Sequence, residues 1–247
     1  MKIFFHIGQY FILLGRVFQR PERYSLYFKQ FVNEIEKLGV SSIGITFIIS
    51  IFTGIVITMQ TAYNVLTNPM VPSFIAGLTV RDMLMLEFSN SVLGLILAGK
   101  VGSNIASELG TMRVTEQIDA MEIMGVNSAS YLIMPKILAA MFFNPFLNIL
   151  SIGIGIFGGY LISFTTKILT PDTFVTGLYY HFEPYYIIYS LIKTVVFAFI
   201  ITSVSAYNGY YVSGGALEVG RASTRAVVYS SILLLLANVI LTQFLLS

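Results

Sequence analysis

The stretch from Ile43 to Ala62, IGITFIISIFTGIVITMQTA, contains no Asp, Glu, Lys or Arg. A helix of about 20 predominantly apolar residues is long enough to cross the roughly 30 Å hydrocarbon layer of a bilayer. That layer holds no water to bind exposed backbone groups, so a lone segment must satisfy its own N–H and C=O groups as a helix. The stretch therefore predicts a membrane-spanning helix.

Four further segments have the same apolar character. They lie at about 84–106, within 132–164, at about 185–206 and at about 226–246. The window within 132–164 is longer than one crossing requires, and we expect Pro135 and Pro145 to tilt, kink or delay its helix. The sequence thus predicts an all-α integral membrane protein with five spans. Its loops are too short for a second domain, so we expect residues 1–247 to form one domain.

The composition supports a membrane protein. Only 11% of the residues are charged, whereas soluble domains have about 25%. So few charges cannot coat a globule of this size, and 12 acidic against 14 basic residues lack the basic excess of a nucleic-acid binder. These numbers argue against a soluble enzyme, a secreted scaffold, a disordered regulator and a nucleic-acid-binding protein. With no cysteine, the chain has neither disulfides nor thiolate metal sites.

The region before the first span, residues 1–40, has a different pattern. Its start, MKIFFHIGQYFILLGRVFQR, has no small-residue cleavage site, so we expect it to be retained. Apolar residues then recur at helical spacing, at Tyr24, Tyr27, Phe28, Phe31, Val32, Ile35 and Leu38. This stripe predicts an amphipathic helix in the plane of the membrane interface. A cytosolic helix packed on a partner is the alternative. Residues 41–247 would form the five-span membrane domain.

Basic residues predict the orientation, because Lys and Arg collect on the cytoplasmic side. With the N-terminus placed inside, eleven of the fourteen lie inside, only Arg81 and Lys167 lie outside, and Lys193 lies within the fourth span. The eleven are Lys2, Arg16, Arg20, Arg23, Lys29, Lys37, Lys100, Arg113, Lys136, Arg221 and Arg225. The distribution predicts a cytoplasmic N-terminus and, after five spans, a C-terminus on the opposite side.

The end of the second span carries a stripe of small residues. They recur every four positions, at Gly94, Ala98, Gly102, Ala106 and Gly110. Such a stripe lets another helix approach closely, so plain helix packing is its first explanation. Gly94 to Lys100 also spells G-x-x-x-x-G-K, but Val101 replaces the Ser or Thr of a phosphate-binding loop and the context is an apolar helix. We therefore expect no ATPase in this chain.

A short amphipathic helix is predicted between the second and third spans, capped by Thr111 and ended by Gly125. Val114, Ile118 and Met121 would form its apolar side, and Glu116, Asp119 and Glu122 would lie broadly together. One interpretation is a solvated face on an interfacial helix. The other is a cytoplasmic docking helix that fits a cleft on a partner, which a membrane subunit without its own energy source would need.

A few polar residues fall in or near the spans, where an ionisable side chain is costly unless it finds water or a partner. Glu87 either extends toward the outer headgroups or serves a substrate cavity. Lys100 is expected to anchor at the inner headgroups, and Lys193 to pair with a neighbouring span. Neither His6 nor His181 has the spacing of a metal site, so none is expected.

Three collinear motifs resemble the MlaE-type permeases, membrane subunits of ABC transporters that move lipid between the two membranes of Gram-negative bacteria. They are FTGIVITMQ at 52–60, ELGTMRVTEQIDAMEIMGV at 108–126, and GGALEVGRASTRAVVYSS at 214–231, which is followed by LT at 241–242. The resemblance covers most of the chain after residue 40. It departs from the family at Lys100, where Arg is common, and at Asn238, where an acidic residue is frequent.

The resemblance implies an inner-membrane permease that works as a homodimer and carries phospholipid. It implies a separate cytosolic ABC ATPase, which would hold ATP and magnesium, and a periplasmic MCE-domain lipid-binding protein; a small cytosolic STAS-like subunit is a further candidate partner. The helix between spans two and three would be the coupling helix, with the ATPase-contact candidates Glu108, Thr111, Arg113, Glu116, Gln117, Asp119 and Glu122. The candidates for a lipid cavity or dimer interface are Gln60, Glu87, Gly94, Ala98 and Gly102.

Two other classes of function are weighed against this hypothesis. A secondary transporter, or a channel for a small hydrophobic solute, predicts carboxylates at mid-span, which are scarce, and usually shows paired repeats, into which five spans do not divide. An integral-membrane enzyme acting on lipid predicts His, Asp or Glu clustered at one interface. The acidic cluster that exists has no His nearby in the sequence.

Overall fold

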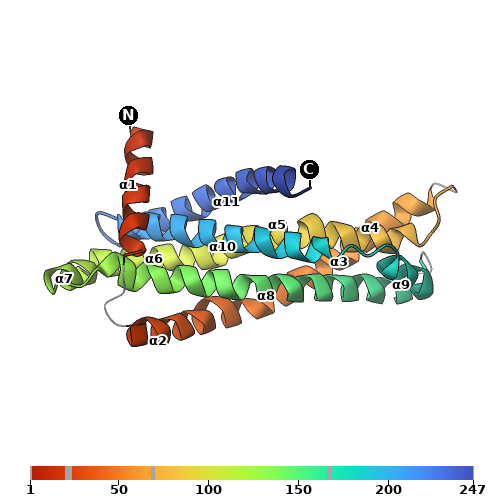
Figure 1. Cartoon of the computed structure of the whole chain (residues 1–247), viewed down its shortest axis with the longest axis horizontal. Helices are drawn as coiled ribbons and strands as arrows, with labels where there is room; N and C mark the ends of the chain where they lie inside the picture. Colours follow the sequence, from red (N-terminus) through yellow and green to blue (C-terminus); the bar gives the residue numbers. More distant parts are fainter. Residues whose placement is uncertain (1, 20–23, 68–69, 166–168, 247) are drawn as a thin grey trace. The chain divides into compact units, whose positions relative to one another are not determined.

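The computed structural model describes residues 2–19, 24–67, 70–165 and 169–246, and these ranges contain helices and no β-strand (Figure 1). Arg20, Arg23 and Lys167, which enter the orientation argument, lie outside the described residues. Five helical stretches are long and apolar enough to span a membrane, as the sequence predicts. They are Leu26–Val65, Ile75–Val114, Ser128–Thr165, Tyr185–Tyr210 and Ala216–Leu246. The chain is thus built as a multi-pass membrane protein.

The N-terminal region contains two helices, α1 (Lys2–Val17) and α2 (Tyr24–Glu34). The helix predicted from Tyr24 is present, but it continues into the first span instead of standing apart from it. The π-helical turn η1 (Ile35–Gly39) and the short 3-10 segment η2 (Val40–Ser42) join α2 to α3 (Ile43–Leu66). Helix α1 was not predicted from the sequence.

The second span is assembled from α4 (Ile75–Met83), η3 (Leu84–Phe88), α5 (Ser89–Leu97), η4 (Ala98–Gly102) and α6 (Ser103–Val114). A seven-residue helix, α7 (Gln117–Ile123), follows it. The third span is α8 (Ser128–Thr165), which runs as one helix through both Pro135 and Pro145. After the short α9 (Pro171–Tyr179), α10 (Tyr185–Tyr210) and α11 (Ala216–Leu246) form the last two spans.

The chain divides into two compact units. The first comprises residues 1–41, 94–144 and 195–247, and the second comprises residues 42–93 and 145–194. Each of the first four spans contributes residues to both units, whereas α11 belongs to the first alone. The expectation of a single domain stays a prediction.

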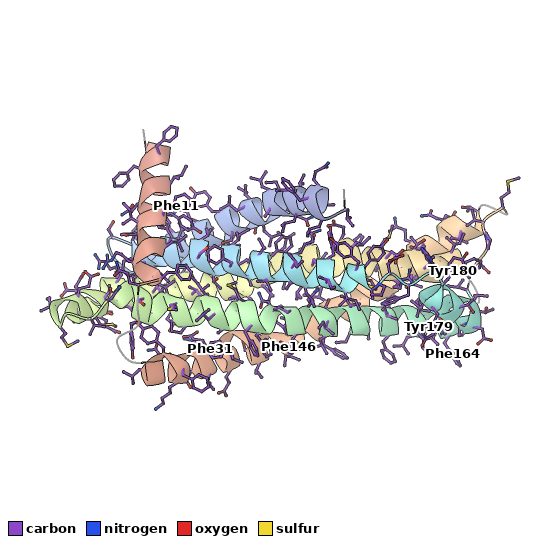
Figure 2. All side chains as sticks on the ribbon, in the orientation of Figure 1. Phe11, Phe31, Phe146, Phe164, Tyr179 and Tyr180 are labelled. Atoms are coloured by element: carbon purple, nitrogen blue, oxygen red, sulfur yellow. The ribbon has the colours of Figure 1, made fainter. Side chains whose placement is uncertain are left out.

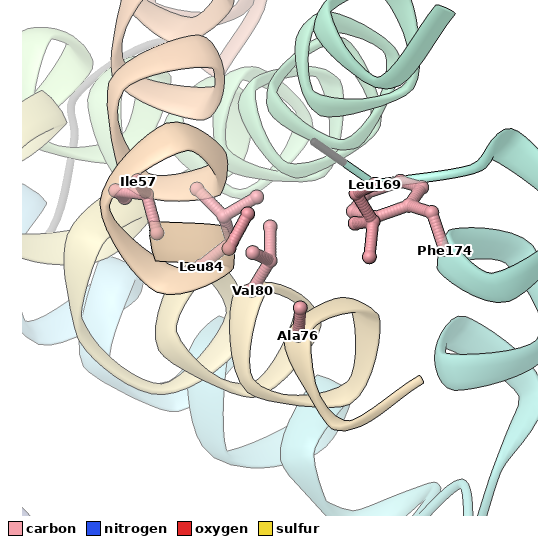
Figure 3. Close-up of a cluster of buried hydrophobic side chains, with 7 residues drawn as sticks. Ile57, Ala76, Val80, Leu84, Leu169 and Phe174 are labelled. Carbon is pink, nitrogen blue, oxygen red and sulfur yellow. The ribbon is translucent and has the colours of Figure 1, made fainter. Parts of the chain in front are cut away.

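The core of the second unit lies where α3, α4 and α9 meet. Its buried side chains are Ile57, Ala62, Ala76, Val80, Leu84, Leu169 and Phe174 (Figure 3). Helices α3 and α8 approach so closely that a Cβ on Gly54 would collide with the Gly155 carbonyl oxygen. Small residues are the usual means by which membrane helices pack at such distances, because lipid supplies no hydrophobic drive between them.

In the first unit, α6 packs against α10 and α11. A Cβ on Gly209 of α10 would stand 2.6 Å from the Ala106 carbonyl oxygen, so only glycine fits there. The small-residue stripe of the second span is used in this packing, because Gly94 faces Leu234 and Phe197, and Gly102 faces Ser205. Helix packing within the chain therefore accounts for the stripe.

Candidate functional site

The connection between the second and third spans differs from the prediction at its start. Thr111 does not cap a new helix: it lies within α6, and its hydroxyl donates to the Ser107 carbonyl at 2.8 Å. A threonine inside a helix commonly bonds the carbonyl four residues back, so it does not interrupt the helix. The break comes at Glu116, whose φ of 60° is left-handed. Helix α7 therefore begins at Gln117 and has seven residues, so it is shorter than the helix predicted between Thr111 and Gly125.

Gly125 ends this connection as predicted. Its φ is +81°, a left-handed conformation that glycine adopts without a steric penalty. Its amide donates to the Glu122 carbonyl at 3.0 Å, and the Val126 amide donates to the Met121 carbonyl at 3.0 Å. Such bonds satisfy carbonyls at the helix end that have no partner within the helix.

The two faces of α7 have opposite characters. Ile118 is fully buried, and the neighbouring Asp119 accepts a hydrogen bond from Arg113 at 2.6 Å. On the outside, Glu116 and Gln117 are exposed. Ile123 and Met124 are 87% and 71% exposed, which is unusual for apolar side chains beside a buried face. The tip of α7 therefore presents acidic, polar and apolar groups together.

Glu122 has an intramolecular role that sequence reasoning missed. Its Oε1 accepts hydrogen bonds from Arg16 of α1 at 2.8 Å, from Tyr210 at 2.9 Å and from Ser128 at 3.0 Å. The hydrogen bond from Arg16 is the main cause that lowers the pKa of the Glu122 carboxyl below its usual value, and it outweighs burial, which acts in the opposite direction. Glu122 thus ties α7 to α1 and to α10. No local pattern could indicate a contact across 106 residues.

An open groove of about 370 Å³ lies beside this junction. It is lined by Arg16, Gln19, Glu122, Gly125, Val126 and Asn127. Asn127 donates from its side-chain amide to the Arg16 carbonyl and to the Gln19 side chain, both at 3.0 Å. The groove therefore lies where the end of α1 contacts the segment between the second and third spans.

Glu108, a candidate for partner contact, belongs to a cluster of charges in the first unit. Its Oε2 lies 2.9 Å from the Lys136 ammonium and 2.7 Å from that of Lys37. Lys136 also meets Glu34 of α2 at 2.6 Å, and its side chain is only 4% exposed. The cluster joins α2, η1, α6 and α8, and its two cations balance two carboxylates.

Within the second unit, Lys193 of the fourth span pairs with Glu87 of the second span. The expectation that Lys193 pairs with a neighbouring span is therefore confirmed. The Lys193 ammonium lies 2.8 Å from Glu87 Oε1 and donates to the Tyr189 hydroxyl at 2.6 Å. Lys193 is fully buried, whereas the Glu87 side chain is 39% exposed. One turn further along, Asn90 accepts hydrogen bonds from Ser190 at 3.0 Å and from Thr194 at 3.1 Å. A polar layer therefore lies inside helices that are otherwise apolar.

The remaining candidates are divided between the two units, with Gln60 in the second and Gly94, Ala98 and Gly102 in the first. Gly94, Ala98 and Gly102 pack within the chain, and Gln60 is exposed on α3. Their assignment to a lipid cavity or a dimer interface stays a prediction. Lys100 donates to the Ser41 carbonyl, so its ammonium binds the end of η2.

The structure also bears on nucleotide binding and on metal binding. The near match to a phosphate-binding loop, residues 94–100, lies in the continuous helix of α5 and η4, which lacks the strand, loop and helix such a site needs. Within the described residues, no three His, Cys, Asp or Glu side chains are grouped so that they could hold a metal ion.

Comparisons with known proteins agree with one another. The family model described as Permease MlaE matches residues 31–244. A probable ABC transporter permease of Rickettsia bellii is 37% identical, covering 96% of this chain and 91% of its own length. The intermembrane phospholipid transport system permease protein MlaE of Haemophilus influenzae is 31% identical, covering 94% and 88%. The chloroplastic protein TRIGALACTOSYLDIACYLGLYCEROL 1 of Arabidopsis thaliana is 29% identical, covering 94% and 66%.

Proposed function

The chain belongs to the MlaE permease family, and from this membership we propose that it is the permease subunit of an ABC transporter that moves phospholipid between the inner and outer membranes. The match over residues 31–244 carries the proposal, since it spans all but the first part of the chain. The five apolar helices support it, because an oily cargo requires no line of charges through the membrane. No observation favours a secondary transporter or a channel.

The proposal includes a separate energy source. An ABC permease is one component of a transporter, and the near match to a phosphate-binding loop at residues 94–100 of this chain is helical. ATP and magnesium would be bound by a cytosolic ATPase subunit. Hydrolysis there would drive the permease through a mechanical contact.

Helix α7 is the proposed contact. Ile123 and Met124 offer apolar groups that a cleft on the ATPase would bury, and Glu116 and Gln117 offer polar groups at the rim. Asp119 and Glu122 face arginines of this chain, so their contribution would be to hold α7 in position. Thr111, Arg113 and Glu108 would support the helix from within α6.

This placement requires the N-terminus and α7 to be cytoplasmic and the C-terminus periplasmic. The distribution of Lys and Arg supports that orientation. A periplasmic MCE-domain protein would then receive or deliver the lipid at the opposite end. A STAS-like subunit on the cytoplasmic side is a further proposed partner.

We propose that the functional unit is a homodimer with the lipid cavity between two copies. Helix α11 supports this, because its second half leaves Leu235, Leu236, Val239 and Ile240 exposed. Glu87 is the proposed polar group of the cavity, since it is the accessible half of its ion pair. Gln60, Gly94, Ala98 and Gly102 are the further candidates.

The proposal is tested by purifying the chain with its co-expressed ATPase and measuring lipid transfer between vesicles. Reversing charge with Glu116→Lys, together with Met124→Ser, should release the ATPase and stop ATP-dependent transfer while the permease stays folded. The matched control is Glu183→Lys, an exposed acid outside the described spans and outside α7. If the ATPase remains bound and transfer continues in the α7 variant, the docking assignment is wrong.

A further inference from the structure

Ser89, the first residue of α5, has a buried hydroxyl group that its own helix does not satisfy. Hydroxyl groups in helices commonly donate to the carbonyl four residues back, as Thr58 of α3 does to Gly54 at 2.8 Å. For Ser89 that carbonyl belongs to Met85, which accepts from the Asn90 side chain at 3.2 Å. Ser89 is 4% exposed, and its hydroxyl has no hydrogen-bond partner among the described residues. Because a buried hydroxyl without a partner is costly, this group indicates a ligand.

Ser89 lines a small cavity between α3, α5 and α8, and all of the lining residues belong to the second unit. The cavity has a volume of about 10 Å³, which is room for one water molecule and too little for an acyl chain. None of its lining residues is charged, so it lacks the carboxylates that usually hold a metal cation. Its polar lining consists of four residues with hydroxyl groups, namely Ser50, Thr53, Ser89 and Ser151.

Two of these hydroxyl groups form a pair that has hydrogen-bonding capacity left over. The Ser50 and Ser151 oxygens are 2.8 Å apart, and Ser50 also lies 2.6 Å from the Thr46 carbonyl oxygen. A hydroxyl has one proton and two acceptor lone pairs, so Ser50 donates to only one of these oxygens at a time. If it donates to Ser151, the Ser151 proton is available. If it donates to Thr46, Ser151 donates to Ser50 and keeps its lone pairs. In both arrangements Ser151 is able to bond a further group.

The cavity lies within helices that turn apolar side chains outward. Phe146 and Phe164 project from α8 and are 55% and 74% exposed (Figure 2), whereas Ser151 of the same helix is 5% exposed. On the second span, the lining includes Leu84 and Phe88 of the π-helical turn η3. A π-helical turn departs from the regular spacing of side chains, which accounts for a gap in otherwise close packing. In membrane helices, such turns and ordered waters together satisfy polar groups.

We propose that this cavity is a binding site for one water molecule, held by Ser89 of α5 and by the Ser50–Ser151 pair of α3 and α8. Buried waters make about three hydrogen bonds, and these hydroxyl groups provide them. The water would join the second span to the first and third spans. Because a bound water exchanges its partners more easily than a packed side chain does, the second span can shift at this level. The site is independent of what the protein transports.

Labelling by hydroxyl radicals tests for the water directly. An X-ray pulse converts bound water into radicals that oxidise the side chains beside it, and mass spectrometry measures the rate for each residue. The full-length chain is irradiated in lipid nanodiscs. The reporters are Leu84 and Leu93, which line the cavity and are 1% and 4% exposed. The matched control is Leu97, which is 1% exposed, lies on α5 with Leu93 and does not line the cavity.

We expect Leu84 and Leu93 to be oxidised several-fold faster than Leu97. Equal rates in the unmodified chain would overturn the proposal, and this comparison needs no substitution.

A variant tests the position of the water. Ser89→Val puts methyl groups into the cavity, so the rates of Leu84 and Leu93 should fall to that of Leu97. The control Ser91→Val makes the same change outside the cavity lining and should leave both rates raised. Thermal melting of the two variants in detergent checks that each is folded. Unchanged rates in folded Ser89→Val, or an equal fall in Ser91→Val, would show that the radicals do not come from this cavity and would overturn the site.

Discussion

Among the residues that the structure describes, two lysines lie buried in ion pairs, and their surroundings differ. Lys136 in the first unit meets two carboxylates, Glu34 and Glu108, and Lys37 completes a neutral cluster. Lys193 in the second unit meets Glu87, the Tyr189 hydroxyl and the Leu86 carbonyl. The Glu34 side chain is 14% exposed and that of Glu87 is 39% exposed. In the first cluster Lys37 and Glu108 are 44% and 28% exposed and are paired with each other, whereas in the second the exposed member is the acid that pairs with Lys193.

The difference separates two uses of charge in a membrane protein. In a cluster of two cations and two carboxylates, a group that turned to a ligand would leave another charge unpaired, so such a cluster serves to hold elements together. An ion pair with one accessible member can exchange that partner for water or a polar headgroup at lower cost. We therefore assign a structural role to Lys136, whereas Glu87 is accessible for contact with a ligand.

Removing Lys136 should have the largest effect on stability. In Lys136→Met, Glu34 and Glu108 would stay together with Lys37 alone, and breaking a buried pair in this way costs about 3–5 kcal/mol. The thermal melting temperature in detergent should fall accordingly. A triple variant that adds Glu34→Leu and Glu108→Leu should recover most of the loss, since no buried charge is then left unpaired and Lys37, which is 44% exposed, can be hydrated. If the triple variant is no more stable than the single one, the cluster does not act through its charges.

The same substitution at Lys193 should cost less. In Lys193→Met the Glu87 carboxylate loses its cation but is accessible enough to be hydrated or protonated, so we expect about 1–3 kcal/mol. Thermal melting of Lys136→Met and Lys193→Met, measured side by side, tests the contrast between the four-membered cluster and the pair of Lys193 with Glu87. Equal losses at the two positions would contradict it. Lipid transfer should fall more in Lys193→Met than its stability loss explains, because Glu87 is the proposed polar group of the cavity.

The exposed pair of Glu122 and Arg16 should have the smallest effect on global stability, below about 1 kcal/mol, since such pairs are hydrated and screened. Its pH dependence has a definite sign. Arg16 lowers the pKa of the folded Glu122, so the stabilisation is present above the ordinary carboxyl pKa and is lost as the pH falls through the lowered value. Hydrogen exchange in α1 should therefore become faster as the pH is lowered over that range, after correction for intrinsic exchange.

A variant gives the control for this pH effect. Glu122→Gln should show fast exchange in α1 at neutral pH and no further change on acidification. Asp119→Asn, which alters the other ion pair of α7, should leave α1 as in the unmodified chain. An α1 whose exchange responds to pH equally in Glu122→Gln would show that another group controls its attachment.

Much of the fold followed from local sequence. Each span is a long apolar run, and a lone segment in hydrocarbon has no way to satisfy its backbone except as a helix. Gly125 was correctly predicted to end α7, because a left-handed residue after a helix favours glycine. Thr111 was the error: its hydroxyl serves equally well inside a helix as at a cap, and only the continuation of α6 to Val114 decides between them.

The candidate sites were less predictable. Glu108 and Glu122 were both candidates for contact with a partner, yet each carboxylate binds a cation from a distant part of this chain. Nothing in the local sequence distinguishes Glu108, Glu116 and Glu122. Their contacts depend on which basic residues the fold brings near each of them. Glu116, directly before α7, is exposed, and its contact with a partner stays a prediction.

By itself, the sequence determined that the chain is helical, lies in lipid, and crosses it five times, because hydropathy and backbone hydrogen bonding act within each segment. It also contained the motifs by which the family is recognised. Only the tertiary structure decided which charges are buried together, that the small-residue stripe is used within the chain, and that α1 is fastened to α7 and α10. Those outcomes depend on contacts between segments up to about 200 positions apart, and side-chain electrostatics at such separations is set by packing, which no local pattern encodes.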